Sequence, residues 1–210
     1  MKRKLVLLTV MILILSLVFP GCSGKDTANS TTDETAPETL DASAFIEWFG
    51  TGQKLRKAKE KEHTFRLTED ITLTQEIRLD SRSVTLNLDG HSITGGTFRA
   101  FTLTNGASLT LTGGSLSTKG DNSDGGVIRL TDSNLTLDNM KVQNTDDSHI
   151  SERRIGGVIY AISKKPEQGV ITLTGGTELT GSASGLRRSG GSIAMAGKAP
   201  RTRFMNYGMN

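Results

Sequence analysis

The sequence predicts an all-β solenoid, in which short strands stack in successive turns, here called rungs. The first observation is a recurring phrase in which aliphatic residues alternate with threonine; it occurs at Ile71–Thr74, Val84–Leu88, Leu109–Thr112, Leu135–Leu137 and Ile171–Thr174. Alternation places the aliphatic side chains on one face of a strand and threonine, whose branched Cβ suits strands, on the other. The second observation is spacing, because the phrase returns roughly every 20–35 residues with no long helical pattern between its copies.

The copies can be superposed on one another. Phe101–Leu111 is expected to run parallel to Val127–Leu137, which brings the turn formers Asn105-Gly106 and Asp132–Asn134 to one corner. A second anchor is a glycine pair that leads into isoleucine; it occurs at Gly125–Ile128, Gly156–Ile159 and Gly190–Ile193. Glycine pairs supply positive φ at tight corners. The alternative is an antiparallel β-sandwich, whose strands also alternate but rarely repeat one phrase.

One copy carries a family resemblance. Leu86–Ile93 reads Leu-Asn-Leu-Asp-Gly-His-Ser-Ile. It resembles the Leu-Asp-Leu-Asn-Gly-His-Thr-Ile rung of right-handed parallel β-helix proteins, the pectate-lyase-like folds found among bacterial surface lipoproteins and adhesin-like proteins, with Asn87 and Asp89 exchanged. The resemblance covers about residues 64–197 and implies a right-handed parallel β-helix, which we assign to residues 63–197. It is specific for the fold and says little about activity.

The N-terminus has the layout of a secretory signal. Lys2–Lys4 are basic and precede the apolar run Leu5–Phe19. This run is shorter than the ~20 residues that a membrane-spanning helix needs. Cys22, the only cysteine, then resembles the end of a lipobox, where the thiol is diacylated, although Pro20 departs from the usual motif. We expect residues 1–21 to be a lipoprotein signal peptide and Cys22 the lipid attachment site; the alternative is ordinary secretion with an incidental cysteine.

Two segments separate the signal from the strands. Residues 22–40 are rich in serine, threonine, alanine and acidic residues, and they predict a flexible tether. Phe45, Trp48 and Phe49 fall on one helix face, so residues 41–62 are expected to form a helical cap over the first rung. A clustered aromatic face favours a core position for the tryptophan over a ligand-binding one.

The charge balance argues against a nucleic-acid partner. The formal charge of +3 equals that of the three basic residues in the signal, and the remaining chain is neutral. Two glutamates, Glu60 and Glu62, are interleaved with basic residues, which is typical of a solvated helix face; the basic residues are Lys54, Arg56, Lys57, Lys59 and Lys61.

Acidic residues that resemble catalytic motifs lack the required arrangement. Asn144–Asp147 resembles, in letters, a motif of polygalacturonase-type β-helix hydrolases. Asp146 and Asp147 are adjacent, however, and would point to opposite faces of a strand. A glycosidase needs two carboxyl groups on one face, ~5–10 Å apart. His91 lies on an earlier rung, so we predict no catalytic residue.

Metal and sugar sites are also not predicted. Asp121 and Asp124 stand in a short acidic loop that resembles part of a calcium loop but lacks its closing glutamate. Sugar-binding faces usually expose aromatic residues, and between residues 66 and 197 these are Phe98, Phe101 and Tyr160. We therefore assign no metal, no cofactor and no sugar-binding residue.

The last residues and the function complete the prediction. Residues 198–210 show no alternation and are expected to be an irregular tail, either a native one or the mark of a longer solenoid cut short.

The resemblance implies an exported protein, lipid-anchored at the cell membrane or cell surface, for surface display, adhesion or glycan contact without catalysis. Its expected partners are the membrane and a polysaccharide or surface glycan, not nucleic acid. The alternative is a polysaccharide lyase or glycoside hydrolase of the same fold.

Overall fold

The computed structural model describes residues 38–120, 125–145, 154–155, 157–165, 168–181, 188–189, 192–197 and 201–204. The chain divides into two compact units, residues 1–35 and 36–210, and all described residues belong to the second. The predicted signal peptide and Cys22 lie outside the described residues.

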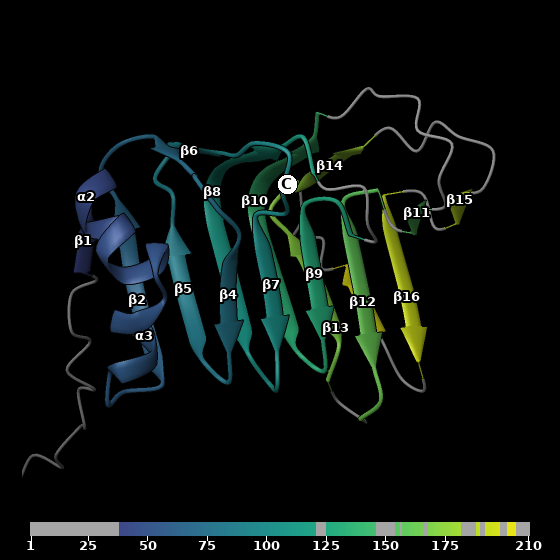
Figure 1. The fold of residues 1–210 in the computed structure, drawn as a ribbon. Helices are drawn as coiled ribbons and strands as arrows, with labels where there is room; N and C mark the ends of the chain where they lie inside the picture. The colour runs from purple at the N-terminus through teal and green to yellow at the C-terminus, as the bar shows by residue number, and fades with distance from the viewer. Residues whose placement is uncertain are drawn as a thin grey trace, which may run out of the picture. The chain divides into compact units, whose positions relative to one another are not determined.

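The largest sheet has the strand order β1-β2-β5-β8-β10-β13-β17, with β3, β6 and β14 attached at its side. Its strands are β1 (Glu38–Leu40), β2 (Glu62–Leu67), β3 (Ile71–Thr72), β5 (Ser83–Asn87), β6 (Ser92–Thr94), β8 (Ser108–Thr118), β10 (Asn134–Asn144), β13 (Val170–Thr174), β14 (Glu178–Gly181) and β17 (Arg201–Phe204). We call it sheet A. In Figure 1 it forms the rear layer of the unit.

The second sheet, here sheet B, has the order β16-β12-β9-β7-β4 and forms the front layer in Figure 1. Its strands are β4 (Ile77–Asp80), β7 (Phe101–Thr104), β9 (Ile128–Thr131), β12 (Ile159–Ser163) and β16 (Ile193–Gly197). A two-stranded sheet pairs β11 (Arg154–Ile155) with β15 (Arg188–Ser189). All strand pairs among the described residues are parallel. The unit is therefore all-β with parallel sheets, and the antiparallel sandwich is wrong.

The core lies between sheets A and B and consists of the aliphatic residues of the recurring phrase. Leu137 on β10 lies opposite Leu111 on β8 and Leu173 on β13, and these three side chains are at most 8% exposed. The predicted inward stacking of these leucines is confirmed. Each fully buried leucine contributes about 1.5–3 kcal/mol to the stability of the fold. A chain with one cysteine can form no internal disulfide, so the stacked aliphatic side chains hold the unit together.

The long strands β8 and β10 each bend once. They pair with each other on one side, and on its other side each pairs with two shorter strands. Strand β8 pairs with β5 before its bend and with β6 after it. The bend is at Gly113, with φ of 65°, and the bend of β10 is at Asn139, with φ of 51°. Next to this bend, a Cβ on Gly114 would lie 2.4 Å from the carbonyl oxygen of His91, so only glycine fits there. Gly113 and Gly114, which follow the phrase Leu109–Thr112, therefore mark a corner.

A second corner connects sheet B to sheet A. The amide of Gly106 donates to the carbonyl of Asp132 over 2.8 Å, so the two predicted turn segments do share one corner. Asn105, Gly106 and Asp132 all have positive φ, a conformation that asparagine, aspartate and glycine tolerate best.

The predicted register is wrong by one residue on one side of this corner. Leu109 lies opposite Leu135, as expected, but Phe101 lies opposite Ile128 instead of Val127. The reason is turn length: three residues separate β7 from β8, and two separate β9 from β10.

The glycine-pair anchor is confirmed. Ile128, Ile159 and Ile193 lie opposite one another on β9, β12 and β16. Gly126, in the first anchor, is tightly enclosed, since a Cβ there would lie 2.8 Å from the carbonyl oxygen of Gly157. The anchor thus serves close backbone packing as well as positive φ.

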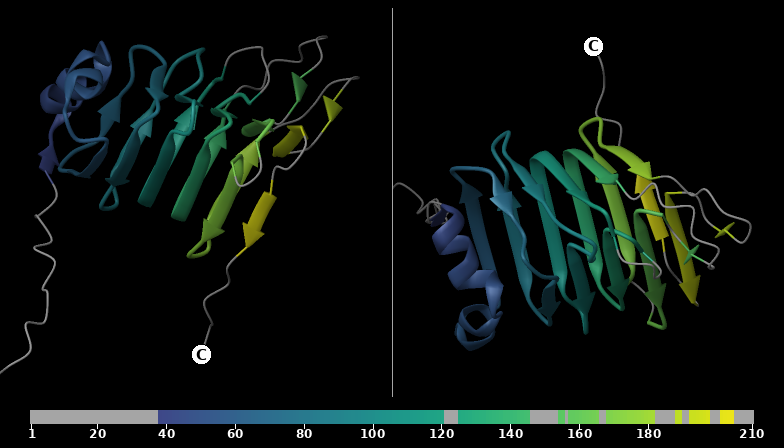
Figure 2. Two further views of the ribbon diagram at one scale, coloured as in Figure 1. Left: turned by 90° about the horizontal axis from the view of Figure 1, so that it is seen from below. Right: turned by 45° about the horizontal axis from the view of Figure 1, so that its top comes forward.

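The N-terminal boundaries differ from those predicted. Residues 38–40, placed in the tether, form β1, which pairs with β2 and buries Leu40 completely. The cap contains α2 (Ala42–Phe45), the π-helix η1 (Ile46–Gly50) and α3 (Gln53–Lys57), and its predicted last residue, Glu62, begins β2. Gly52, with φ of 63°, separates the helices because a left-handed residue cannot continue a right-handed helix. Figure 2 shows the helices at the β2 end of the sheets.

The aromatic residues of the cap are core residues. Phe45, Trp48 and Phe49 are buried, and the last two pack on Phe65 of β2 with ring centroids 5.0 and 5.6 Å away. The indole N–H of Trp48 donates to Glu38 Oε1 over 3.0 Å. The predicted core position of this tryptophan is confirmed.

The tail is not irregular throughout. Arg201–Phe204 forms β17, which pairs in parallel with Val170–Leu173 of β13. Backbone pairing does not require alternating side chains at an edge strand, so the absence of the phrase misled the prediction.

Candidate functional site

The outer face of sheet B carries a row of dissimilar side chains. Its members occupy equivalent positions on neighbouring strands and are Arg78, Thr102, Arg129, Tyr160 and Ala194. They alternate with inward residues such as Leu79 and Leu103 and therefore point away from the core. We call this row the outer row.

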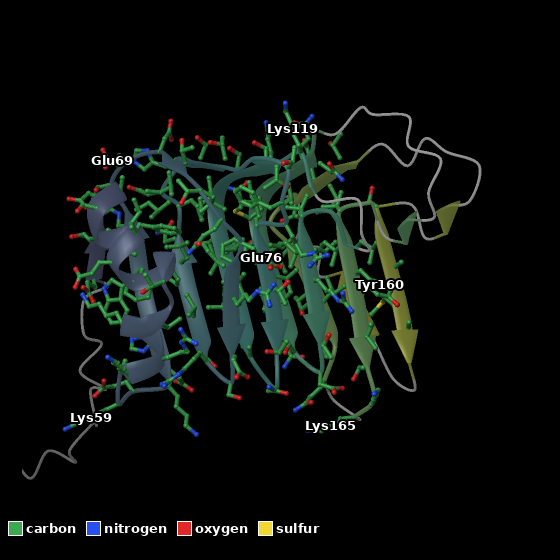
Figure 3. All side chains as sticks on the ribbon, in the orientation of Figure 1. Lys59, Glu69, Glu76, Lys119, Tyr160 and Lys165 are labelled. Atoms are coloured by element: carbon green, nitrogen blue, oxygen red, sulfur yellow. The ribbon has the colours of Figure 1, made fainter. Side chains whose placement is uncertain are left out.

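A buried ion pair stands beside the outer row, in the middle of Figure 3. Arg99, which is 6% exposed, holds its Nη1 3.2 Å from Glu76 Oε1 and donates from Nε to the carbonyl of Gly125 over 2.8 Å. The hydroxyl of Thr102 donates to the same carboxylate oxygen. Arg78 approaches the other oxygen, Glu76 Oε2, at 2.8 Å. Charge-assisted hydrogen bonds of this kind compensate the burial of the charges and fix the carboxylate in place.

A groove of about 460 Å³ lies between this part of sheet B and the cap. The cap contributes the turn Phe49–Gly52 and Arg56. Sheet B and the two residues before β4 contribute polar side chains: Gln75, Glu76, Arg78, Asp80, Thr102 and Thr104. Its volume is within the range of small-molecule sites, roughly 300–1,000 Å³, but those sites are mostly apolar. A polar groove of this size suits a ligand that both donates and accepts hydrogen bonds.

The two carboxylates of the groove come from well-separated backbone positions. Glu76 and Asp80 are four residues apart along one extended segment, which separates their backbones by about 13 Å. A glycosidase needs about 5–9.5 Å between its carboxyl groups. Glu76 is also held by two arginines. The groove therefore offers recognition groups without an evident acid–base pair.

The structure does not describe the acidic residues that the sequence analysis considered for catalysis and calcium binding. Asp121, Asp124, Asp146 and Asp147 are outside the described residues. Among the residues that the structure describes, no group of three or more histidine, cysteine, aspartate or glutamate side chains is placed to hold a metal ion.

His91 and an acidic neighbour lie beside sheet A, next to strands β6 and β3. The Nδ1 atom of His91 lies 3.5 Å from Asp70 Oδ1, which also accepts the amide of Ser92 over 2.8 Å. The hydrogen bond from Ser92 is the main reason that the pKa of Asp70 lies below its ordinary value. This pair links the residue before β3 to the start of β6. It is separate from the groove carboxylates.

The three aromatic residues of the strand region have different positions. Phe101 is 1% exposed in the core, and Phe98 packs against the core from the side. Tyr160 belongs to the outer row, because its neighbours Ile159 and Ala161 occupy the inward positions, and it is 8% exposed. The glycine-pair anchor, which fixes Ile159 as inward, is the sequence signal that could have placed it. The groove itself had no such signal, since it depends on where the cap lies.

Comparisons of this chain with models of protein families, with curated proteins and with solved structures found no match. In the described part of the chain, no helix has the length and apolar character needed to cross a membrane.

Proposed function

We propose that the second unit is a right-handed parallel β-helix that is exported, anchored to the membrane through a lipid on Cys22, and used for surface display and glycan contact without catalysis. The parallel pairing of equivalent phrases along the chain supports the β-helix. The apolar run before Cys22 supports export and anchoring.

The observation that carries glycan contact is the polar groove beside the outer row. It presents two arginines, two carboxylates, a carboxamide and threonine hydroxyls from sheet B, the residues just before β4 and the cap. A sugar ring has hydroxyl groups that donate and accept, so it can be met by such a mixed set. A groove on rigid strands also loses little conformational freedom when a ligand binds.

The test is a glycan array probed with the full chain in mild detergent. Arg78→Gln removes an exposed groove arginine that is paired with Glu76. Arg66→Gln is the matched control, since Arg66 is also a surface arginine in an ion pair, with Asp89 on sheet A. We expect glycan signals that fall in the first variant and persist in the control. Equal signals in both, or no glycan signal from the wild type, would refute contact through the groove.

A parallel assay separates the enzymatic alternative. Release of unsaturated or reducing sugars from the glycans that bind would show a lyase or hydrolase. For the anchor, we expect labelling by radioactive palmitate that is lost in Cys22→Ala.

A further inference from the structure

A second polar feature lies on the cap, away from the groove carboxylates. Residues 56–61, which we call the basic loop, join the end of α3 to β2. Its charged side chains are all exposed: Arg56, Lys57, Lys59, Glu60 and Lys61. Four positive charges against one negative charge within six residues make it a strongly basic segment of a unit that is otherwise nearly neutral.

The basic loop is held in one conformation by the neighbouring strand. Arg82, just before β5, donates from Nη1 to the carbonyls of Ala58 and Glu60 over 3.1 and 2.7 Å. Its Nη2 donates to the carbonyl of Arg56 over 2.7 Å. Because Arg82 binds only backbone oxygens of the loop here, the lysine side chains remain directed to solvent. An ordered loop loses less conformational entropy on binding than a flexible one.

The loop also lies at the end of the sheet where the chain enters it. Strand β1 is parallel to β2, and Glu38 lies opposite Phe65. The chain therefore enters β1 from the end of the sheet at which β2 begins, beside the basic loop. Glu38 and the first residue of β2 are about 10 Å apart along the strand direction. Glu38, the first described residue, thus lies at this end of the sheet, on the side of the loop.

We propose that the basic loop binds the anionic phospholipid headgroups of the membrane to which the N-terminus is tethered. The inference rests on the proposed anchor at Cys22 for bringing the loop near a bilayer. Clusters of lysine and arginine next to a membrane anchor are attracted to the negative surface of anionic lipids, and the attraction is screened by salt. Contact through the loop turns the cap and strand β2 toward the bilayer.

The test reconstitutes the full chain in vesicles of phosphatidylcholine, with and without phosphatidylglycerol, and measures how fast an amine reagent labels each lysine. We expect Lys59 to be labelled roughly fivefold more slowly on the anionic vesicles, with the difference lost in ~1 M salt. Lys119, at the opposite edge of the unit in Figure 3, is the internal reference and should react equally on both. Equal labelling of Lys59 on both vesicles would overturn the proposal.

Two variants locate the effect, with Lys61 as the reporter. Lys57→Glu with Lys59→Glu should abolish the slow labelling of Lys61, whereas Lys119→Glu with Lys141→Glu, the same change in charge at exposed positions elsewhere, should leave it. If the control pair abolishes it as well, net charge and not the loop is responsible, and the proposal fails. Should the first pair fail to fold, the labelling of the wild type still decides.

Failure of the anchor is distinguishable from failure of the loop. Flotation of the wild type with vesicles in ~1 M salt reports the anchor alone, because loop attraction is then screened. If the chain does not float, it is added to preformed vesicles at low salt, and the same difference in labelling is expected. Glycan signals on the array should be the same for the loop variants and the wild type.

Discussion

The outer row of sheet B and one row on the outer face of sheet A differ in how much their side chains vary. Sheet A repeats one residue at equivalent positions of five strands: Thr64, Thr85, Thr110, Thr136 and Thr172. The outer row of sheet B has two arginines, a threonine, a tyrosine and an alanine at its five positions. Threonine suits an exposed strand position whatever the protein does. Strand formation alone does not call for the varied row, so a binding role is better sought on sheet B.

The largest effect is expected in the core that both faces share. Leu137 has no exposed surface and touches its equivalents on both sides. Leu137→Ala should lower the free energy of unfolding by about 2–5 kcal/mol, and Leu137→Asp should prevent folding, because an unpaired charge would be buried. Denaturant unfolding followed by circular dichroism measures both. A midpoint unchanged in Leu137→Ala would mean that the core is not the common support of the two sheets.

Close backbone packing should matter equally on the two sheets. A Cβ at Gly114 of sheet A or at Gly126 beside sheet B would lie within 3 Å of a backbone oxygen. Gly114→Ala and Gly126→Ala should each cost about 1–3 kcal/mol of unfolding free energy. Gly96→Ala, where the added methyl would meet a movable phenyl ring, is the control and should cost less. A large loss in only one of the two tight variants would show that the sheets differ in their backbone as well as in their surface.

Removal of one hydroxyl from each face sharpens the comparison directly. Thr102 donates to Glu76 in the cluster beside the outer row, so Thr102→Val should cost about 0.5–1.5 kcal/mol of unfolding free energy. Thr136 repeats a residue found on every neighbour, and Thr136→Val should stay within about 0.5 kcal/mol. Thermal unfolding of the two variants side by side is the measurement. Equal losses would remove the distinction between a repeated face and a specialised one.

The smallest effect concerns pH and the corner between the two sheets. The pKa of Asp132 lies below its ordinary value of 3.8, mainly because its carboxylate accepts the amide of Lys164 over 2.7 Å. A lowered pKa in the folded state adds stability above the ordinary pKa, and this is lost as the pH falls through the folded-state value. Asp132→Asn keeps the acceptor oxygen and tolerates the positive φ. Its stability should therefore fall less steeply than that of the wild type in unfolding experiments between about pH 6 and about pH 2. Parallel curves would show that Asp132 contributes nothing through its charge.

The sequence predicted what depends on repetition and missed what depends on a single contact. The stacked leucines, the corner at Asn105-Gly106 and the isoleucines of the glycine-pair anchor follow from copies of one phrase. The pairing of β17 and the end of the cap did not, since each is fixed by the backbone of a neighbouring strand.

The candidate site was less predictable than the fold. The groove is lined by the turn at Gly52 together with Arg78, which are 26 positions apart in the sequence. The buried ion pair links Arg99 to Glu76 across 23 residues. Neither the turn nor the pair is repeated along the chain, so neither can be predicted from the alternation or the spacing of residues. The clamp of Arg82 on the basic loop is of the same kind, because one arginine side chain binds three carbonyls of a preceding segment.

The two kinds of corner differ in length, and this has a consequence for protein engineering. The corners from β4 to β5, β7 to β8 and β9 to β10 contain two or three residues, and the corner from β12 to β13 contains six. The connections into sheet B vary more, with four residues before β4, six before β7, nine before β9, fourteen between β10 and β12 and eleven between β14 and β16, while the isoleucine and phenylalanine positions stay aligned. The fold thus already accommodates inserted sequence at these connections. A foreign epitope is therefore better grafted into one of these connections than into a short corner, at a position away from Glu76, Arg99 and Gly126.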